Sequence, residues 1–429
     1  MSEIDVDAID FFREESLIAD PYPYFDQLRE QCPVRREPHH DVVMVTGYEE
    51  AVEVYHDTAV FSSANAVTGP FPPFPVPLVG DDVSELIEQH RDEMPFYDQL
   101  PNMDPPTHTA HRGLLMRLIT PKRLKENEDF MWRLADRQLD EFLQRGECEF
   151  ISDYGGPFAL LVIADLLGVP EEDQPTFREE LQGRKRAQTG GALGSPTEQT
   201  LAHSPLEFLY DRFTAYIEDR RRDPHGDVLT GLATATFPDG SLPDVIDVAR
   251  VAANLFAAGQ ETTVRLLGMA LQTLGQRPDI QEELRAHRDR IPNFIEECLR
   301  IESPVKGDFR LSRVPTNVGG IDLPAGTQVM VLNGAANRDP RRFENPGEFQ
   351  VERVNARQHI SFGHGIHTCP GAPLARAEGR ISVERWLDRA DNIRMSEAKH
   401  GPADARRYEY VPTYILRGLK TLYLEFDPR

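Results

Sequence analysis

The sequence has 429 residues, 40% of them hydrophobic and 28% charged, which is the balance of a soluble globular protein. Its formal net charge of −24 argues against a nucleic acid as a partner. The four cysteines are scattered and form neither a CxxC pair nor a disulfide framework, so we expect a reduced, cytoplasmic setting. No apolar segment follows Met1, and we expect neither a signal peptide nor a membrane anchor.

Two basic stretches interrupt this acidic background. Residues 112–125 contain five lysines and arginines and no acid, and residues 353–380 contain four arginines against Glu378 alone. Concentrated positive charge on an acidic protein indicates a docking patch for an acidic partner. Ordinary solvated helix faces are the alternative explanation.

The N-terminal region predicts a short helix, then strands, then a long loop. Residues 41–46 have the composition of a strand that turns at Gly47. Residues 62–102 are expected to form the loop, because residues 70–77 contain five prolines and cannot lie inside a helix. Apolar side chains on so stiff a backbone suit the wall of a pocket, and a proline-rich surface segment is the alternative.

Residues 104–112 predict the start of a helix with two side chains suited to a carboxylate. Asp104 is expected to cap this helix, and the prolines that follow are tolerated in a first turn. His108 and Arg112 are four residues apart and therefore share one helical face. A solvated helix face is the alternative explanation for this pair.

The region from 125 to 235 is helical in pattern, apart from a glycine-rich, flexible segment at 190–196. The longest predicted helix follows, from near Asp244 to near Gly275. About 32 residues at about 1.5 Å each make a rod of about 48 Å, enough to cross the molecule. Its apolar centre is expected to be buried, where an internal glycine costs roughly 1 kcal/mol and polar side chains are expensive unless they are used.

Glu297 and Arg300 lie three residues apart on one face of a further predicted helix, in position for a charge-assisted pair. Arg338 or Arg353 is expected to join them in a buried network. We assign this group a structural role and no catalytic one. Near the C-terminus, residues 410–419 predict a strand, a turn and a second strand.

Residues 362–371 read Phe-Gly-His-Gly-Ile-His-Thr-Cys-Pro-Gly. Three glycines let the backbone come close to a flat object and adopt dihedral angles that other residues avoid. A helix is expected directly behind this loop, with Pro373 in its first turn. Because a helix N-terminus stabilises negative charge, Cys369 has the place of a thiolate that stays ionised and binds a metal. A buried, inert cysteine is the alternative.

This decapeptide resembles the signature of the cytochromes P-450, a family of haem-thiolate monooxygenases, which is F-G-x-G-x-H-x-C-x-G. The matching positions are Phe362, Gly363, Gly365, His367, Cys369 and Gly371. The family's A-G-x-[DE]-T motif is matched at Ala258, Gly259, Glu261 and Thr262, and its E-x-x-R motif at Glu297 and Arg300. Glu261 stands where aspartate is also common. The resemblance runs from about residue 20 to the end of the chain.

The resemblance implies a mainly α protein with a small β lobe and a long central helix over the haem. Residues 1–429 would form a single cytochrome P-450 domain. The sheet-rich part is expected at about residues 20–65, 305–335 and 405–429, packed on a helical core. The glycine-rich segment at 190–196 would belong to a mobile lid over the pocket.

The same resemblance implies how haem b would be held. Cys369 would supply the axial thiolate, in a binding loop that includes Phe362, Gly363 and Gly371. The expected anchors of the haem propionates are His108, Arg112, Arg310 and His367.

It also implies the residues of catalysis and substrate binding. Ala258 and Gly259 would leave room for dioxygen. Glu261 would relay protons and Thr262 would orient them, its hydroxyl bonding back toward the Ala258 carbonyl and opening the helix locally. The expected substrate contacts are Phe71, Phe74, Val76, Val305, Tyr414 and Ile415.

A protein of this family is expected to insert one oxygen atom from O2 into an apolar small molecule such as a terpenoid, steroid, fatty acid or aromatic. Electrons would come from a separate ferredoxin and its NAD(P)H-dependent reductase, and we expect a monomer. The alternatives are a peroxide-driven peroxygenase, which typically lacks the acid–alcohol pair, and a non-catalytic haem sensor or carrier. The sequence does not identify the substrate.

Overall fold

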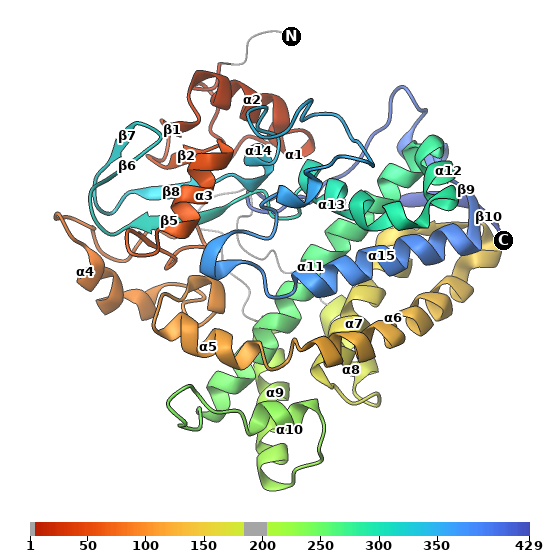
Figure 1. The fold of residues 1–429 in the computed structure, drawn as a ribbon, viewed down its shortest axis with the longest axis horizontal. Coiled ribbons are helices and arrows are strands. Elements are labelled where there is room, and N and C mark those ends of the chain that lie inside the picture. The colour runs from red at the N-terminus through yellow and green to blue at the C-terminus, as the bar shows by residue number, and fades with distance from the viewer. Residues whose placement is uncertain (1–4, 184–203) are drawn as a thin grey trace.

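The computed structural model describes residues 5–183 and 204–429. The glycine-rich segment at 190–196, and with it the predicted lid, lies outside the described residues. Figure 1 shows a sheet-bearing lobe at the upper left and a group of helices at the right, with α11 (Val245–Gln276) running between them. The predicted architecture, mainly α with a small β lobe, is confirmed.

The lobe is built on a five-stranded sheet in the order β1-β2-β8-β5-β3. β2 pairs in parallel with β8, and the other neighbouring strands are antiparallel. The strand predicted at residues 41–46 is confirmed as β2, which is buried throughout because it lies inside the sheet. The strands of the lobe are β1 (Val34–Arg36), β2 (Val43–Val45), β3 (Phe61–Ser62), β5 (Asp308–Ser312), β8 (Gln328–Val331) and the hairpin of β6 (Thr316–Val318) with β7 (Ile321–Leu323).

Short helices surround this sheet. The predicted first helix is confirmed, and the region 62–102 contains one α-helix, α4, within its loop. The helices of the lobe are α1 (Ser16–Ala19), α2 (Tyr22–Gln31), α3 (Tyr48–His56), α4 (Ser84–Gln89) and α14 (Asn333–Ala336).

α5 (Thr107–Leu115) begins where the sequence predicts a helix, but the expected cap is wrong. Pro106 precedes the helix, and no side chain caps its described N-terminus. The Asp104 carboxylate accepts a hydrogen bond from Ser63 N at 2.9 Å and pairs with Arg313 at 2.7 Å and with Arg91. Two largely buried guanidinium groups compete better for a buried carboxylate than a helix amide does. Asp104 therefore ties the start of α5 to the sheet.

The helical part packs around α11, whose bounds confirm the predicted long helix to within a residue at each end. α7 (Gly156–Leu167) is apolar on nearly all sides because it lies between α6 (Pro121–Phe142) and α11. Among the described residues, no helix is both long and apolar enough to cross a membrane. The remaining helices are α8 (Gln174–Gly183), α9 (Ser204–Arg222), α10 (Val228–Ala233), α12 (Pro278–Ala286), α13 (Ile291–Ile301), α15 (Ala372–Arg389) and α16 (Glu397–His400).

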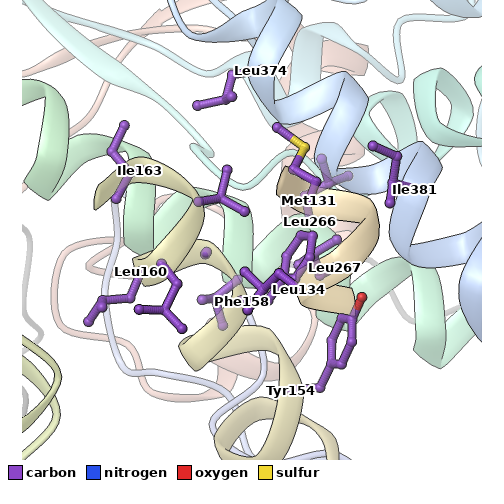
Figure 2. Packing of buried hydrophobic residues seen from close by; sticks show 14 of the residues in the cluster. Met131, Leu134, Tyr154, Phe158, Leu160, Ile163, Leu266, Leu267, Leu374 and Ile381 are labelled. Carbon is purple, nitrogen blue, oxygen red and sulfur yellow. The ribbon is translucent and has the colours of Figure 1, made fainter. Parts of the chain in front are cut away.

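The main hydrophobic core forms where α6, α7, α11 and α15 meet, and Figure 2 shows side chains from these helices interlocking. Full burial of such a side chain contributes roughly 1.5–3 kcal/mol. The core therefore fixes α11 against α15, which starts behind Cys369. The residues labelled in Figure 2 are Met131, Leu134, Tyr154, Phe158, Leu160, Ile163, Leu266, Leu267, Leu374 and Ile381.

The predicted pair of Glu297 and Arg300 is confirmed on α13, with both side chains fully buried. Arg353 joins it, as predicted, by donating from Nε to Glu297 Oε1 at 2.9 Å. Arg338 instead donates to the carbonyl of Ile301. Each buried charge in the network is paired, which is the condition for keeping ions inside a protein.

The C-terminal residues differ from the prediction. Across residues 410–419, all of them described, the structure has isolated bridges from Val305 to Leu416 and from Tyr410 to Leu419, and no strand. Pro412 lacks an N–H, which disfavours a regular ladder here. The regular strand is β10 (Tyr423–Pro428). It pairs with β4 (Glu147–Glu149) and β9 (Ala390–Met395) in a separate sheet beside the helices, not in the lobe.

Candidate active site

Cys369 lies in the loop between a short 3₁₀ turn, Gly365–His367, and the start of α15. Its amide donates to the carbonyl of Phe362 at 2.8 Å, which closes the loop. Gly365 has a φ of +69°, and a Cβ there would lie 2.7 Å from the carbonyl oxygen of Tyr55. Both the dihedral angle and the close approach therefore require glycine at this position. Of the four cysteines, Cys148 and Cys298 are buried, whereas Cys32 and Cys369 are half-buried.

The surroundings of the Cys369 sulfur suit a metal ligand. Burial raises the pKa of the Cys369 thiol, while hydrogen bonds from the Gly371 and Ala372 amides and the charges of Arg112 and Arg376 act in the opposite direction. A bound cation would complete the stabilisation of the thiolate. No group of three or more histidine, cysteine or acidic side chains among the described residues could hold a metal ion.

Four predicted anchors supply positive charge and donors near this loop. The His108 and His367 rings lie 4.1 Å apart between centroids, and Arg112 Nη2 donates to the carbonyl of Thr368 at 2.6 Å. Burial, followed by the charge of Arg112, lowers the pKa of His108 to about 4. Burial, followed by the charge of Arg310, lowers the pKa of His367 to about 2. Both imidazoles are therefore neutral at pH 7.

His108 Nε2 is buried and has no hydrogen-bond partner among the described residues. An unpaired buried nitrogen is costly, and a carboxylate brought beside it and the neighbouring arginines would remove that cost. Arg310 already has other partners, because its Nη1 donates to Asp308 Oδ1 at 3.1 Å and to the Phe309 carbonyl at 2.6 Å. Only part of its guanidinium group is therefore available to bind such a carboxylate. A candidate thiolate ligand beside the unpaired His108 Nε2 and the charges of Arg112 and Arg310 fits haem, which carries both an iron and propionates.

The second part of the site is the middle of α11. From Ala257 to Thr262 the helix keeps accessible surface, although it is largely buried on either side of this stretch. Thr262 Oγ1 donates to the Ala258 carbonyl at 2.8 Å, which is the predicted back-bond. A Cβ at Gly259 would meet Ile163 of α7 at 3.4 Å, so this glycine faces a helix, whereas Ala258 is exposed.

Glu261 pairs with Arg265, one helical turn further along α11. The Arg265 side chain is 4% exposed and lies against Gly418, where an added Cβ would collide with it. We did not predict Arg265 from the sequence, although its i,i+4 spacing from Glu261 is a recognisable signal. A second contact, from Thr263 Oγ1 to Glu378 Oε2 at 3.2 Å, links α11 to α15 and has no signal in the sequence.

The six predicted substrate contacts fall into two groups. Val305 and Ile415 belong to segments joined by the bridge from Val305 to Leu416 and by Lys306 N donating to the Ile415 carbonyl. Tyr414 packs beside them against Phe12, with 5.0 Å between ring centroids.

Phe71 contacts the same Phe12 ring at 5.8 Å. Phe74 packs in a separate small cluster with Leu311, and Val76 lines a surface groove of about 330 Å³ nearby. The structure thus groups four of the candidates and sets Phe74 and Val76 apart. Their roles in substrate binding stay predictions.

Comparisons with known proteins give a consistent result. The model of the family described as Cytochrome P450 matches residues 232–391. "Cytochrome P450 144" of Mycobacterium tuberculosis is 34% identical over 97% of this chain and 91% of that protein. "Cytochrome P450 monooxygenase PikC" of Streptomyces venezuelae is 31% identical over 95% of this chain and 91% of that protein. The solved structure of Mycobacterium marinum cytochrome P450 CYP150A6, substrate-free, is 59% identical with a TM-score of 0.93, and covers 99% of this chain and 100% of that one.

Proposed function

The chain belongs to the cytochrome P450 family, and we propose that it oxidises an apolar small molecule (a terpenoid, steroid, fatty acid or aromatic) with electrons from a separate ferredoxin. As a member it is a monooxygenase that carries haem on a cysteine thiolate. Two observations carry the proposal: the Gly371 and Ala372 amides bond Cys369 in the loop before α15, and the Thr262 hydroxyl bonds back to the Ala258 carbonyl on α11.

Four residues would hold the cofactor's carboxylates. His108, Arg112, Arg310 and His367 would serve the propionates, and the unpaired Nε2 of His108 supports this assignment. Cys369 would supply the thiolate ligand, since it lies in the loop just before α15 and receives hydrogen bonds from the Gly371 and Ala372 amides. Bound haem supplies the chemistry that activates dioxygen.

The acid–alcohol pair on α11 would deliver protons. The Glu261 side chain, paired with Arg265, is 31% exposed, so water reaches its carboxylate. Thr262 Oγ1 donates to the Ala258 carbonyl and, when that bond opens, would hand a proton toward the reaction site while accepting a replacement proton from the water that also contacts Glu261. Exposed Ala258 would leave space beside them. The presence of both Glu261 and Thr262 on α11 supports a monooxygenase over a peroxide-driven enzyme.

Electrons would enter across the basic stretches. Arg117, Lys122 and Lys125 are exposed near the start of α6, and Arg357 is exposed near the loop of Cys369. α6 and α15 pack together, so the two stretches belong to neighbouring elements. An acidic ferredoxin would be attracted to this surface.

The test is turnover with a reconstituted electron-transfer chain. Compounds of the four classes would first be screened for the shift of the Soret band that accompanies a change of spin state on binding. A compound that binds should then give product with steady consumption of NAD(P)H when a ferredoxin and its reductase are present. Product formed with hydrogen peroxide but never with the reductase system would favour the peroxygenase. Binding without product under either condition would favour a carrier.

A further inference from the structure

Behind the loop of Cys369 lies an ionic cluster to which none of the three family motifs assigns a role. Its centre is Glu296 on α13, which is 3% exposed. Glu296 Oε1 accepts from Arg376 Nε at 2.7 Å, and Oε2 accepts from Arg376 Nη2 at 3.0 Å, which makes a two-bonded fork. His359 and the exposed Arg357 complete the group. We call these four residues the Glu296 cluster.

The hydrogen bonds determine the state of His359. Its Nδ1 accepts from the amide of Ser361 at 3.1 Å, so the ring proton is on Nε2. Nε2 lies 3.1 Å from Glu296 Oε2 and donates to it. Burial lowers the pKa of His359, and the ring is therefore neutral.

Glu296 is ionised. Burial alone would raise its pKa, but the hydrogen bonds from His359 and Arg376 lower the pKa of Glu296 to about 2. The cluster thus holds one carboxylate against the guanidinium of Arg376, with a neutral imidazole as a second donor. Arg357, whose side chain is 74% exposed, approaches the same carboxylate at 3.3 Å and is screened by water.

The cluster contacts the cysteine loop through Phe362. The Arg376 guanidinium lies 4.8 Å from the centroid of the Phe362 ring, and the His359 ring lies 5.7 Å from it. The carbonyl of Phe362 accepts the Cys369 amide at 2.8 Å. The Phe362 side chain therefore lies between the Glu296 cluster and the backbone of the Cys369 loop.

Arg376 also acts on Cys369 through space. Its positive charge favours the thiolate over the thiol, although less than Arg112 does. A positive charge close to the sulfur stabilises the more negative, reduced state of a bound metal centre, and a carboxylate paired with that charge cancels part of the effect.

We propose that Glu296 is a positioning residue for the haem ligand: it holds the Arg376 guanidinium over the Phe362 ring and offsets the guanidinium charge behind Cys369, which sets the reduction potential of the bound haem. The inference rests on the proposed role of Cys369 as that ligand. It explains why a carboxylate is buried beside the E-x-x-R pair although the pair is complete without it.

The test is the midpoint potential of the substrate-free, haem-loaded protein, measured by spectroelectrochemical titration. Glu296→Gln keeps the size of the side chain and leaves the Arg376 charge uncompensated, so the potential should move in the positive direction. Arg376→Gln removes the cation and should move it in the negative direction. The double variant should return close to the parent, and Glu296→Asp should stay near it. Loosening of the loop alone would move both single variants the same way.

Glu384→Gln is the matched control. Glu384 is an acid on α15 that pairs with Arg380 at 3.1 Å, about 18 Å along the helix from Ala372. Its removal should shift the potential less than either cluster variant. Shifts of the same sign in Glu296→Gln and Arg376→Gln, or shifts no larger than that of the control, would overturn the proposal.

A fallback variant and one further measurement distinguish failure of this inference from failure of the proposed function. If Glu296→Gln fails to take up haem, Arg376→Gln alone decides: a negative shift supports the proposal, and no shift or a positive one overturns it. The reduced carbon monoxide spectrum of the parent must show the red-shifted Soret band of a thiolate ligand. If this band is absent, both the proposed function and this inference are overturned. If it is present, the midpoint potentials of the variants test the role of the Glu296 cluster separately.

Discussion

The hydroxyl of Thr262 donates to the carbonyl of Ala258 at 2.8 Å, one turn earlier on the same helix. Because a hydroxyl has one proton, that proton is available to the reaction only when this bond opens. The helix keeps accessible surface at both residues. The Thr262 hydroxyl thus lies on the accessible stretch of α11.

Thr262→Ala should therefore uncouple electron use from product formation. We expect the amount of product per NAD(P)H consumed to fall on the order of tenfold, because a positioned proton donor is lost. The measurement is the ratio of product to reductant consumed in the reconstituted system. Thr262→Ser, which retains the hydroxyl, is the control and should stay near the parent. Unchanged coupling in Thr262→Ala would count against the relay.

The local motifs were predictable because their residues are close in sequence. The bounds of α11 follow from Pro243 before it and Pro278 after it, together with an apolar stretch between them. The pair of Glu297 and Arg300 is read from a spacing of three. The cysteine loop is likewise one continuous segment.

The parts that sequence reasoning missed depend on long-range pairing. Asp104 looks like a helix cap, yet its partner Arg313 is 209 residues away. Glu296 meets Arg376 across 80 residues. No local pattern separates such a buried ion pair from a solvated charge, because the competing partner is known only once the chain has folded.

The buried network on α13 makes a prediction about stability. Glu297→Gln leaves the guanidinium groups of Arg300 and Arg353 without their charge partner in the interior, so the free energy of unfolding should fall by about 3–5 kcal/mol. Denaturant unfolding measures this change. Glu49→Gln is the control, because the Glu49 side chain is 70% exposed and forms a long surface pair with Arg342, at 3.9 Å. It should cost less than about 1 kcal/mol. Equal losses in the two variants would contradict the assignment.

Lys306 makes a prediction about pH. Its side chain is 4% exposed, and Nζ donates to the Thr413 carbonyl at 2.7 Å. Burial, with the charges of Arg417 and Arg265, lowers the pKa of Lys306 from 10.5 to about 7. Between these values the unfolded chain binds the proton and the folded protein does not. The free energy of unfolding should therefore rise with pH from about 7 to 10.5, and below pH 7 the folded protein carries the full cost.

Lys306→Met should remove this dependence. At pH 6 we expect the variant to be more stable than the parent by up to about 4 kcal/mol, because the lowered pKa of Lys306 corresponds to about 5 kcal/mol and the lost hydrogen bond offsets about 1 kcal/mol of it. Its unfolding free energy should also rise less steeply through the alkaline range. Lys420→Met, at a 62% exposed lysine, is the comparison and should keep the parent's slope. A Lys306→Met slope equal to the parent's would show that Lys306 titrates normally in the folded protein.

The basic stretches make a prediction about electron transfer. Arg117→Glu reverses an exposed charge within the first stretch and should raise the KM for an acidic ferredoxin roughly fivefold, equivalent to ~1 kcal/mol. The effect should shrink as salt is added. Arg222→Glu, at the end of α9 and in neither stretch, is the control and should change little. Equal effects of the two reversals would mean that net charge, not this surface, governs docking.

The central claim is that Cys369 is the thiolate ligand of haem. The most direct measurement is the difference spectrum of the reduced, carbon monoxide-bound protein, compared between the parent and Cys369→Ser. We predict the red-shifted Soret band of thiolate-ligated haem in the parent and its loss in the variant. A parent without that band, or a Cys369→Ser variant that keeps it, would contradict the account.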